Sequence, residues 1–356
     1  MGHKKKNTKG GLSLHQQAYN ILTKMLEEGM GRSKREDKQN ECMENYIYTR
    51  NSYMTYWRHI KYFLSWMKSN HPEVTTLDKA RKYVNIWLEG RTNATTTNSE
   101  GDIVNRYSAY TIQTEAAALA KLFHIKPDDP DRFIPPVRSR SEITRSRLVT
   151  KSDSHFSEKR NDLLIRFCKG TGLRREGILN ITGDSLYEAA ELPYVVEGIL
   201  RMPESERSKE DIAFLAAYKL TKAFENKPKY YVWVREKGGK WRLAPVIGPD
   251  VDKIVQKFKE TPPNAKVWSH IPKRCDVHSY RGDYAVMVYK MYARPIEEIP
   301  YDKVSKSTGH KYQGDVYVCR NEKKGLKLDS RAILKAEYAL GHNTKHTFVS
   351  HYSEKI

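Results

Sequence analysis

Cysteines and long apolar runs are both scarce in this sequence, and each scarcity argues against a class of protein. The 356 residues include only four cysteines, which form no CxxC pair or Cys/His cluster: Cys42, Cys168, Cys275 and Cys319. This spacing argues against structural zinc and a disulfide framework, and it favours a reducing, intracellular setting. No segment approaches the roughly 20 apolar residues that span a bilayer. The start, MGHKKKNTKG, has no apolar stretch after it, so we do not expect a secretory signal.

Acidic residues are also in the minority. Lysine and arginine outnumber aspartate and glutamate by 63 to 43, which gives a net charge of +20. A chain this basic usually binds a polyanion, and nucleic acid is the commonest one. A ribosome-associated protein or one bound to an anionic membrane would have the same balance. Hydrophobic residues make up 38% of the chain, which is enough for a packed core, and the length favours two domains.

Changes in composition predict four segments: a basic arm at 1–38, a helical domain at 39–126, a basic linker at 127–155 and a larger domain at 156–356. The arm contains an expected helix at 14–28, which either is solvated or touches DNA or a neighbouring subunit. Further helices are expected at 52–69, 80–90 and 108–125, with a charged connector at 31–38 and a polar loop at 91–102. Prolines and arginines in the linker predict an extended chain.

The larger domain alternates helical patterns with one clear hairpin. The stretch YYVWVREKGGKWRLAPVIG has two β-rich arms around residues 237–240. The expected fold class is therefore mainly α with a small antiparallel β-hairpin or sheet.

Four short segments of this domain carry side chains suited to phosphate chemistry. A glycine-containing break after the expected helix 158–170 places Arg174 at the start of the next helix. Lysines lie at the tip of the hairpin. His278 and Arg281 have the i, i+3 spacing that puts both on one helical face. Finally, Leu340-Gly341-His342 is followed ten residues after the histidine by Tyr352. Each feature alone fits an ordinary turn, a solubilising lysine, or a residue of the core or surface.

In this order, the segments resemble the catalytic set of the tyrosine recombinase (integrase) family. The resemblance covers most of residues 156–356, and the helical segment before them resembles that family's core-binding domain. It implies a site-specific DNA strand transferase that forms a 3′-phosphotyrosine intermediate without a cofactor or metal, integrating and excising a mobile element. The implied catalytic residues are Arg174, Lys237, His278, Arg281, His342 and the nucleophile Tyr352, with Lys240 a non-catalytic neighbour of Lys237.

The implied roles follow ordinary acid–base chemistry. Arg174 and Arg281 would hold the non-bridging phosphate oxygens, because two guanidiniums stay charged at any working pH. A tyrosine has a reference pKa of about 10 and needs a base, for which His278 is the candidate. Lys237 would protonate the leaving 5′ oxygen, and His342 would donate a hydrogen bond to the phosphate.

The resemblance also implies partners and a place in the cell. We expect double-stranded DNA with inverted half-sites, a homotetramer on that DNA, a possible accessory DNA-bending or excision factor, and no membrane. The expected localisation is cytoplasmic and nucleoid-associated. Two alternatives remain open: a type IB topoisomerase-like enzyme, and a catalytically silent DNA-binding protein of the same fold.

Three departures from the family pattern add expectations. The family usually has an acidic residue three positions after the first arginine, where this chain has Gly177, so a shifted carboxylate such as Glu176 is expected to support Arg174. Two inserts are predicted, one helical at about 184–228 and one of strands and turns at about 293–328. Only Ser353–Ile356 follow Tyr352, so either contacts between protomers use another element, such as the N-terminal helix or an insert, or the chain is shortened. Deleting residues 1–30 should then weaken assembly on DNA.

Overall fold

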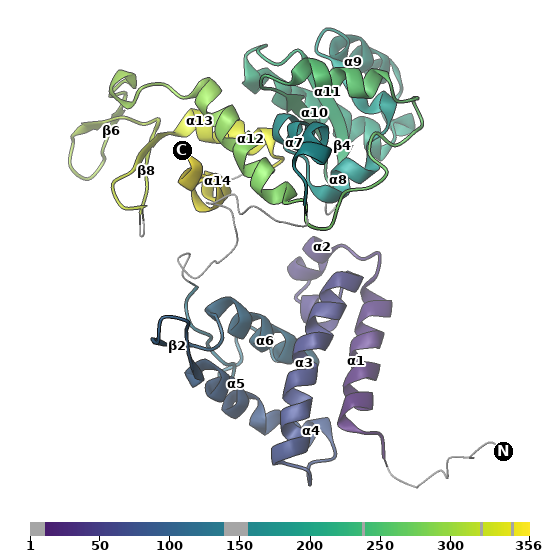
Figure 1. The fold of residues 1–356 in the computed structure, drawn as a ribbon, viewed down its shortest axis with the longest axis vertical. Coiled ribbons are helices and arrows are strands. Elements are labelled where there is room, and N and C mark those ends of the chain that lie inside the picture. The colour runs from purple at the N-terminus through teal and green to yellow at the C-terminus, as the bar shows by residue number, and fades with distance from the viewer. Residues whose placement is uncertain (1–10, 139–155, 237–238, 321–322, 343–344) are drawn as a thin grey trace, which may run out of the picture. The chain divides into compact units, whose positions relative to one another are not determined.

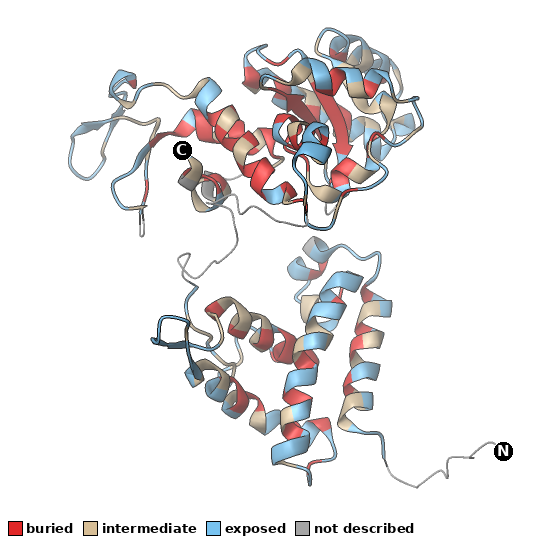
Figure 2. Cartoon of the chain, viewed as in Figure 1, coloured by how far each residue is buried: buried red, intermediate tan, exposed pale blue. Residues whose placement is uncertain are grey.

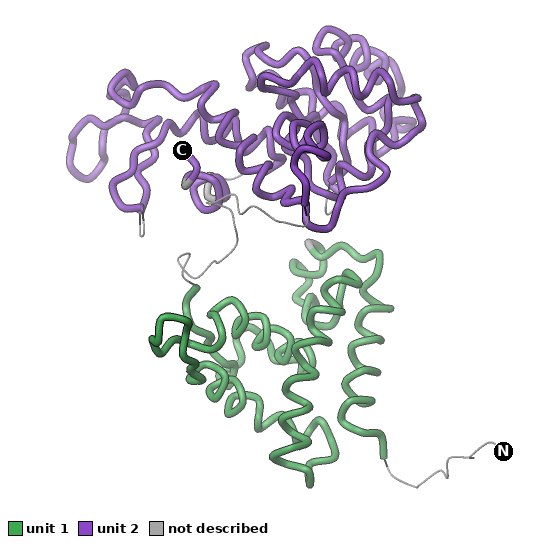
Figure 3. The backbone as a smooth tube through the Cα atoms, in the orientation of Figure 1, with its two compact units in different colours: residues 1–144 green, residues 145–356 purple. Residues whose placement is uncertain are grey.

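The computed structural model describes residues 11–138, 156–236, 239–320, 323–342 and 345–356. The chain divides into two compact units, residues 1–144 and 145–356 (Figure 3). Helices dominate both units and all strand pairing is antiparallel, so the expected mainly-α fold class is confirmed. Within the described ranges, none of the helices combines the length and apolar character that crossing a membrane requires.

Unit 1 is a helical bundle with one short ribbon. Its elements are α1 (Leu14–Gly29), α2 (Lys34–Gln39), α3 (Arg50–Asn70), α4 (Leu77–Ala80), α5 (Val84–Asn93), β1 (Thr95–Thr97), β2 (Ile103–Asn105) and α6 (Ala109–Leu122). Helix α3 lies in the middle and buries Ile60, Phe63 and Met67. Small side chains such as Ala118 let α6 approach α3 closely.

Three expectations for unit 1 need correction. Gly90 does not end its helix, because α5 continues to Asn93. The polar loop at 91–102 instead contributes the last turn of α5 and strand β1, which pairs with β2. The charged connector at 31–38 contains most of α2, whose start is capped by the Ser33 side chain. In all three places, local hydrogen bonds of polar residues form structure that an apolar periodicity does not reveal.

The first helix is part of the core of unit 1. Ala18, Leu22 and Met25 of α1 are buried in the same cluster as the α3 side chains (Figure 2). This helix is therefore not a solvated arm. Deleting residues 1–30 would remove core side chains, so such a deletion would not separate assembly on DNA from folding.

The predicted linker is only partly described. Residues 127–138 contain turns but no helix or strand, and the Gln113 side-chain amide donates to the Pro136 carbonyl at 2.9 Å. This part of the segment therefore packs against α6 and belongs to unit 1, and residues 139–155 lie outside the described ranges.

Unit 2 contains the remaining elements (Figure 1). They are α7 (Asp162–Thr171), α8 (Arg175–Asn180), β3 (Leu186–Glu188), α9 (Leu192–Arg201), α10 (Lys209–Thr221), β4 (Tyr230–Arg235), β5 (Trp241–Val246), α11 (Val251–Lys259), α12 (Val277–Tyr292), β6 (Lys303–Val304), β7 (Lys311–Tyr312), β8 (Val316–Val318), β9 (Lys327–Asp329), α13 (Ser330–Ala339) and α14 (Lys345–His351).

The predicted hairpin is β4–β5, and β3 extends it to a three-stranded sheet. Its side chains alternate between two cores, as strand geometry requires. Tyr231 and Trp233 point into a cluster shared with α10, α12 and α13, whereas Val232 and Val234 point into a cluster shared with α7 and α11. The sheet is thus buried on both faces, which a hairpin pattern alone did not predict.

The two predicted inserts have the expected secondary structure but different surroundings. The first, 184–228, is mainly helical, and Phe214 of α10 packs edge-on against Trp233 of the sheet, with ring centroids 4.9 Å apart. It forms one wall of the core. The second, 293–328, carries β6, β7, β8 and the start of β9, and all four residues of the β6–β7 ribbon are exposed.

Candidate active site

Arg174 lies where the α7–α8 turn brings the chain close to α12. Gly172 ends α7 with a positive φ of 58°, and a Cβ atom there would lie 2.2 Å from the Tyr284 ring. Only glycine meets both conditions without strain. Arg174 then caps the start of α8, as predicted, with its side chain 27% exposed.

Arg281 lies on α12, as predicted, and its side chain is 1% exposed. Its guanidinium donates to the Gly172 carbonyl and, at 2.6 Å, to the Leu340 carbonyl. It therefore ties α12 to the α7–α8 turn and to the end of α13. Burial lowers the pKa of Arg281 to about 10, against the opposing influence of Glu236, so the guanidinium is still charged at neutral pH.

Glu236, at the end of β4, is the centre of the site and was missed in the sequence. Its carboxylate accepts a hydrogen bond from Arg174 and lies 2.9 Å from Nη2 of Arg242 and 3.6 Å from Nη1 of Arg281. Its side chain is only 3% exposed. Burial opposes the charged form of Glu236, but the three arginines outweigh this and lower its pKa to about 2. One buried anion thus holds three cations together.

A signal for Glu236 was present in the hairpin sequence. An acidic residue directly follows the buried strand β4, and Arg242 lies in the facing strand β5. A buried glutamate is stable only beside a cation, so this cross-strand pair could have been predicted. The contacts with Arg174 and Arg281 could not, because those residues lie on other elements.

The expected shifted carboxylate is Glu236, not Glu176. Glu176 is exposed, whereas a Cβ atom at Gly177 would lie 3.8 Å from Oε1 of Glu236. A side chain at position 177 would thus lie against Cγ2 of Val234, at 3.2 Å, and in ordinary contact with the Glu236 carboxylate. The glycine at position 177 has no side chain that makes this contact.

His342 meets Arg174 although 168 residues separate them in the chain. Nη2 of Arg174 lies 2.8 Å from Nε2 of His342, whose Nδ1 lies 2.7 Å from Oε2 of the buried Glu337. A carboxylate beside Nδ1 favours the tautomer protonated there, which leaves Nε2 to accept from Arg174. Donation to a phosphate through Nε2 would require the proton to be on that nitrogen instead.

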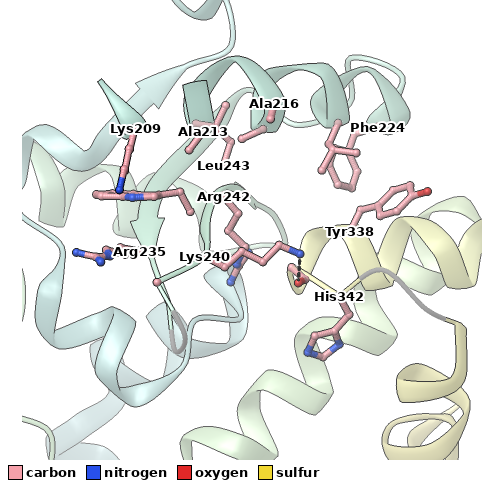
Figure 4. Close-up of a pocket in the computed structure, with 15 residues that line it drawn as sticks. Lys209, Ala213, Ala216, Phe224, Arg235, Lys240, Arg242, Leu243, Tyr338 and His342 are labelled. Carbon is pink, nitrogen blue, oxygen red and sulfur yellow. Dashed lines mark hydrogen bonds between the residues drawn. The ribbon is translucent and has the colours of Figure 1, made fainter. Parts of the chain in front are cut away.

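Gly341 places this histidine. It has a positive φ of 75°, and a Cβ atom there would lie 2.8 Å from Cδ of Arg242. Its carbonyl accepts from Nζ of Lys240 at 2.7 Å, so the hairpin and the end of α13 are joined beside the site (Figure 4).

Tyr352 directly follows α14. Its side chain is buried and packs against Phe348. The Glu337 carboxylate that holds His342 also accepts from the Phe348 backbone N–H. The same buried acid thus positions both the histidine and the helix that carries the tyrosine.

The residues after Tyr352 are fixed on both sides. Nζ of Lys355 lies 2.9 Å from the Ser279 carbonyl oxygen and 2.6 Å from Oδ1 of Asp283, both on α12. Ser353 lies 2.8 Å from Nζ of Lys323, which belongs to the second insert. The short segment after the tyrosine therefore docks on its own chain.

The other two predicted residues are His278 and Lys237. His278 shares helix α12 with Arg281, as expected, but its side chain is exposed where that of Arg281 is buried. Lys237 lies outside the described residues, between Glu236 and Gly239, whose backbone atoms hydrogen-bond at 3.0 Å.

A cavity of about 450 Å³ opens beside the cluster (Figure 4). Its wall includes Ala213 and Ala216 of α10 and Tyr338 of α13, and its rim includes the cations Lys240 and Arg242 near His342. The cavity is therefore lined by apolar side chains of the first insert on one side and by residues of the positively charged cluster on the other.

In the described part of the chain, no group of three or more His, Cys, Asp or Glu side chains is arranged to hold a metal. A scan against models of known protein families finds no match to this chain, and neither does a search of curated protein sequences.

Proposed function

We propose that this protein cleaves and rejoins DNA strands through a covalent phosphotyrosine at Tyr352, as a site-specific recombinase of a mobile element. One observation carries the proposal: Arg174 and Arg281, predicted from distant segments, lie beside the buried carboxylate of Glu236, and Arg174 bonds His342. The acid that holds His342, Glu337, also binds the helix that precedes Tyr352. Three buried or half-buried guanidiniums concentrate positive charge where a phosphodiester would gain negative charge in its transition state.

In this mechanism the DNA phosphate accepts hydrogen bonds from guanidinium groups that, without DNA, bond to other residues of the cluster. Arg174 is the most exposed of the three arginines, so a phosphate meets it first. The Nε atoms of Arg281 and Arg242 are buried, and neither has a hydrogen-bond partner among the described residues. Buried unpaired donors are costly, and an incoming phosphate oxygen could satisfy them.

The chemical step exchanges one phosphate ester for another. The Tyr352 oxygen attacks phosphorus and loses its proton to a base, for which the exposed His278 is the candidate. The bond from phosphorus to the 5′ oxygen breaks, its electron pair stays on that oxygen, and an acid, here Lys237, supplies the proton. Reversal with another 5′-hydroxyl rejoins the strands, so no external energy source is needed.

The proposal extends to partners that the resemblance implies. The substrate would be duplex DNA with inverted half-sites, four protomers would act together on it, an accessory bending or excision factor could take part, and the protein would work at the nucleoid. A high net positive charge of +20 supports a polyanionic substrate.

A nicked suicide duplex tests the chemistry. Wild-type protein should give a covalent protein–DNA band on a denaturing gel, because the cleaved 5′ fragment diffuses away and prevents rejoining. Tyr352→Phe should give none, and Tyr338→Phe, which changes another tyrosine near the cavity, should leave the band. A band that does not depend on Tyr352 would assign the attack to another nucleophile, and no band with wild type would favour a silent DNA-binding protein. Either result would exclude the proposal.

A second assay separates recombination from topoisomerase activity. A recombinase should act only on paired specific sites, whereas a type IB-like enzyme should relax supercoiled DNA of any sequence as a monomer. The helical unit 1 favours the first outcome through the family resemblance.

A further inference from the structure

The second insert carries an exposed surface of positive charge. We use the name cationic arm for its residues 301–320 and 323–327. Six of its lysine and arginine side chains are exposed: Lys303, Lys306, Lys311, Arg320, Lys324 and Lys327. Its described acidic residues are Asp302, which is exposed and accepts from the Gly314 N–H at 3.0 Å, and Asp315, which pairs with Arg294 at 2.9 Å. On the exposed surface of the arm, the six cations therefore face one exposed acid, Asp302.

The β6–β7 ribbon at the far part of the arm has no buried face. Lys303 is paired with Tyr312 and Val304 with Lys311, so each face of the ribbon carries one lysine and one exposed apolar side chain. An isolated two-stranded ribbon is only marginally stable in water. Among the described residues, Lys303, Lys306 and Lys311 form no ion pair, so folding alone does not account for this charge.

The base of the arm is fixed to the unit. Arg294 bonds both Asp315 and the fully buried Asp329, at 2.9 and 2.8 Å. The Gln313 amide donates to the Ile296 and Ile299 carbonyls at 2.6 and 2.7 Å. These contacts hold the ribbon away from the core at a defined place (Figure 1).

The arm is also tied to the nucleophile segment. Lys323, in the β8–β9 connection, lies 2.8 Å from Oγ of Ser353, the residue after Tyr352. The positive surface of the arm therefore begins beside the candidate nucleophile and extends outward to β6 and β7.

We propose that the cationic arm binds the phosphate backbone of duplex DNA flanking the cleaved position. This inference rests on the proposed function, because the scissile phosphate at Tyr352 sets where the duplex lies. The exposed arm has cations on both faces of the ribbon and only isolated apolar side chains. The centre of a protein–protein interface, in contrast, has few charged residues and a continuous apolar surface, so a DNA partner is favoured over a second protein.

A salt series on two duplexes tests the arm. The short duplex ends near the cleaved position, and the long one extends about 20 base pairs further on each side, roughly 70 Å at 3.4 Å per base pair. The variant Lys303→Gln/Lys306→Gln/Lys311→Gln is compared with Lys219→Gln/Lys222→Gln/Lys229→Gln, which removes three exposed lysines from in and beside the first insert. Dissociation constants are measured from 50 to 200 mM salt.

We expect the arm variant to bind the long duplex more weakly at low salt, with a slope of log affinity against log salt that is shallower by up to about 2.7, since each lost phosphate contact removes about 0.9. The short duplex should show little change, and the first-insert variant little change on either duplex. Equal slopes for wild type and the arm variant on the long duplex would overturn the inference. So would a loss of multimers at an unchanged slope, which would assign the arm to a second copy of the chain.

The covalent assay keeps the two proposals apart. If wild type forms the Tyr352-linked band and the arm variant shows the shallower slope, both stand. If no Tyr352-linked band forms, the strand-transfer proposal fails, whatever the slopes are. If the band forms but the slopes do not differ, only the inference about the arm fails.

Discussion

Unit 2 has two regions of positive charge, and they differ in what keeps the charges in place. In the arginine cluster, Arg174, Arg242 and Arg281 surround Glu236, whose side chain is almost completely buried. In the cationic arm, lysines such as Lys303 are exposed to water and form no ion pair in the described structure. Buried cations need a fixed anion because desolvation is costly, whereas water and salt screen exposed ones. One region can orient a phosphate and the other can attract a duplex.

The two inserts differ in their charge and in their exposure to solvent. The first, 184–228, has nine acidic and six basic residues, and its α10 packs on the sheet. The second, 293–328, has five acidic and eight basic residues, and much of it is exposed. The first insert thus has a net charge of −3 and the second a net charge of +3, so the two inserts differ in the sign of their charge.

Removing the anion should have the largest effect. We expect Glu236→Gln to lower the free energy of unfolding by about 3–5 kcal/mol, because it leaves buried guanidiniums without a counter-charge. The Tyr352-linked band should also be lost, since Arg174 and Arg281 lose their shared partner. Urea denaturation and the suicide duplex measure the two effects.

Glu176→Gln is the matched control, because Glu176 is exposed and close to Arg174 in sequence. It should change neither the free energy of unfolding nor the covalent band. Loss of the band with Glu176→Gln but not with Glu236→Gln would show that Glu176 is the carboxylate that supports Arg174. The contrast between buried and exposed charges would then be wrong at this site.

Acid should weaken the arginine cluster but not the arm. Because the pKa of Glu236 is lowered from 4.5 to about 2 on folding, its contribution is complete above about pH 4.5 and is lost as the pH falls toward 2. The loss over this window should be on the order of 3 kcal/mol. Urea denaturation at several pH values should show a steeper decline for wild type than for Glu236→Gln. Parallel declines would mean that the carboxylate is not held ionised by its neighbours.

The residues of the arginine cluster could be predicted from the sequence only in part, and the roles of the inserts could not be predicted. Arg174, Arg281, His342 and Tyr352 could be named from short motifs in the family order, and the structure places the first three in one cluster. The hairpin strands followed from their alternation. The pair of Glu236 with Arg242 could have been predicted from the hairpin, but the contacts of Glu236 with Arg174 and Arg281 could not, because those residues lie on other elements. Glu337 was missed although His342 follows it by five residues, because its burial depends on tertiary packing. The roles of the inserts also depended on tertiary packing, which no local pattern encodes.

Moving the carboxylate from position 236 to position 177 tests whether an acid at position 177 can also bind the arginines. In the background Glu236→Ala, Gly177→Asp should recover about 1–2 kcal/mol of the lost stability, because the new acid enters the space that Glu236 occupied. Urea denaturation compares this double variant with Gly177→Asn in the same background, which separates charge from the helix preference of any side chain. Equal stabilities would show that a carboxylate at 177 cannot reach the arginines.

The smallest effect is expected for a single lysine of the arm. Lys303→Gln should leave the free energy of unfolding unchanged within error, because the side chain is exposed on a ribbon without a buried face. On the long duplex the same change should make the salt slope shallower by up to about 0.9, the share of one phosphate contact. Urea denaturation and binding at several salt concentrations measure both quantities on one protein sample. A clear loss of stability with an unchanged slope would place Lys303 in the same class as the buried arginines, and the contrast between the two regions would then be wrong.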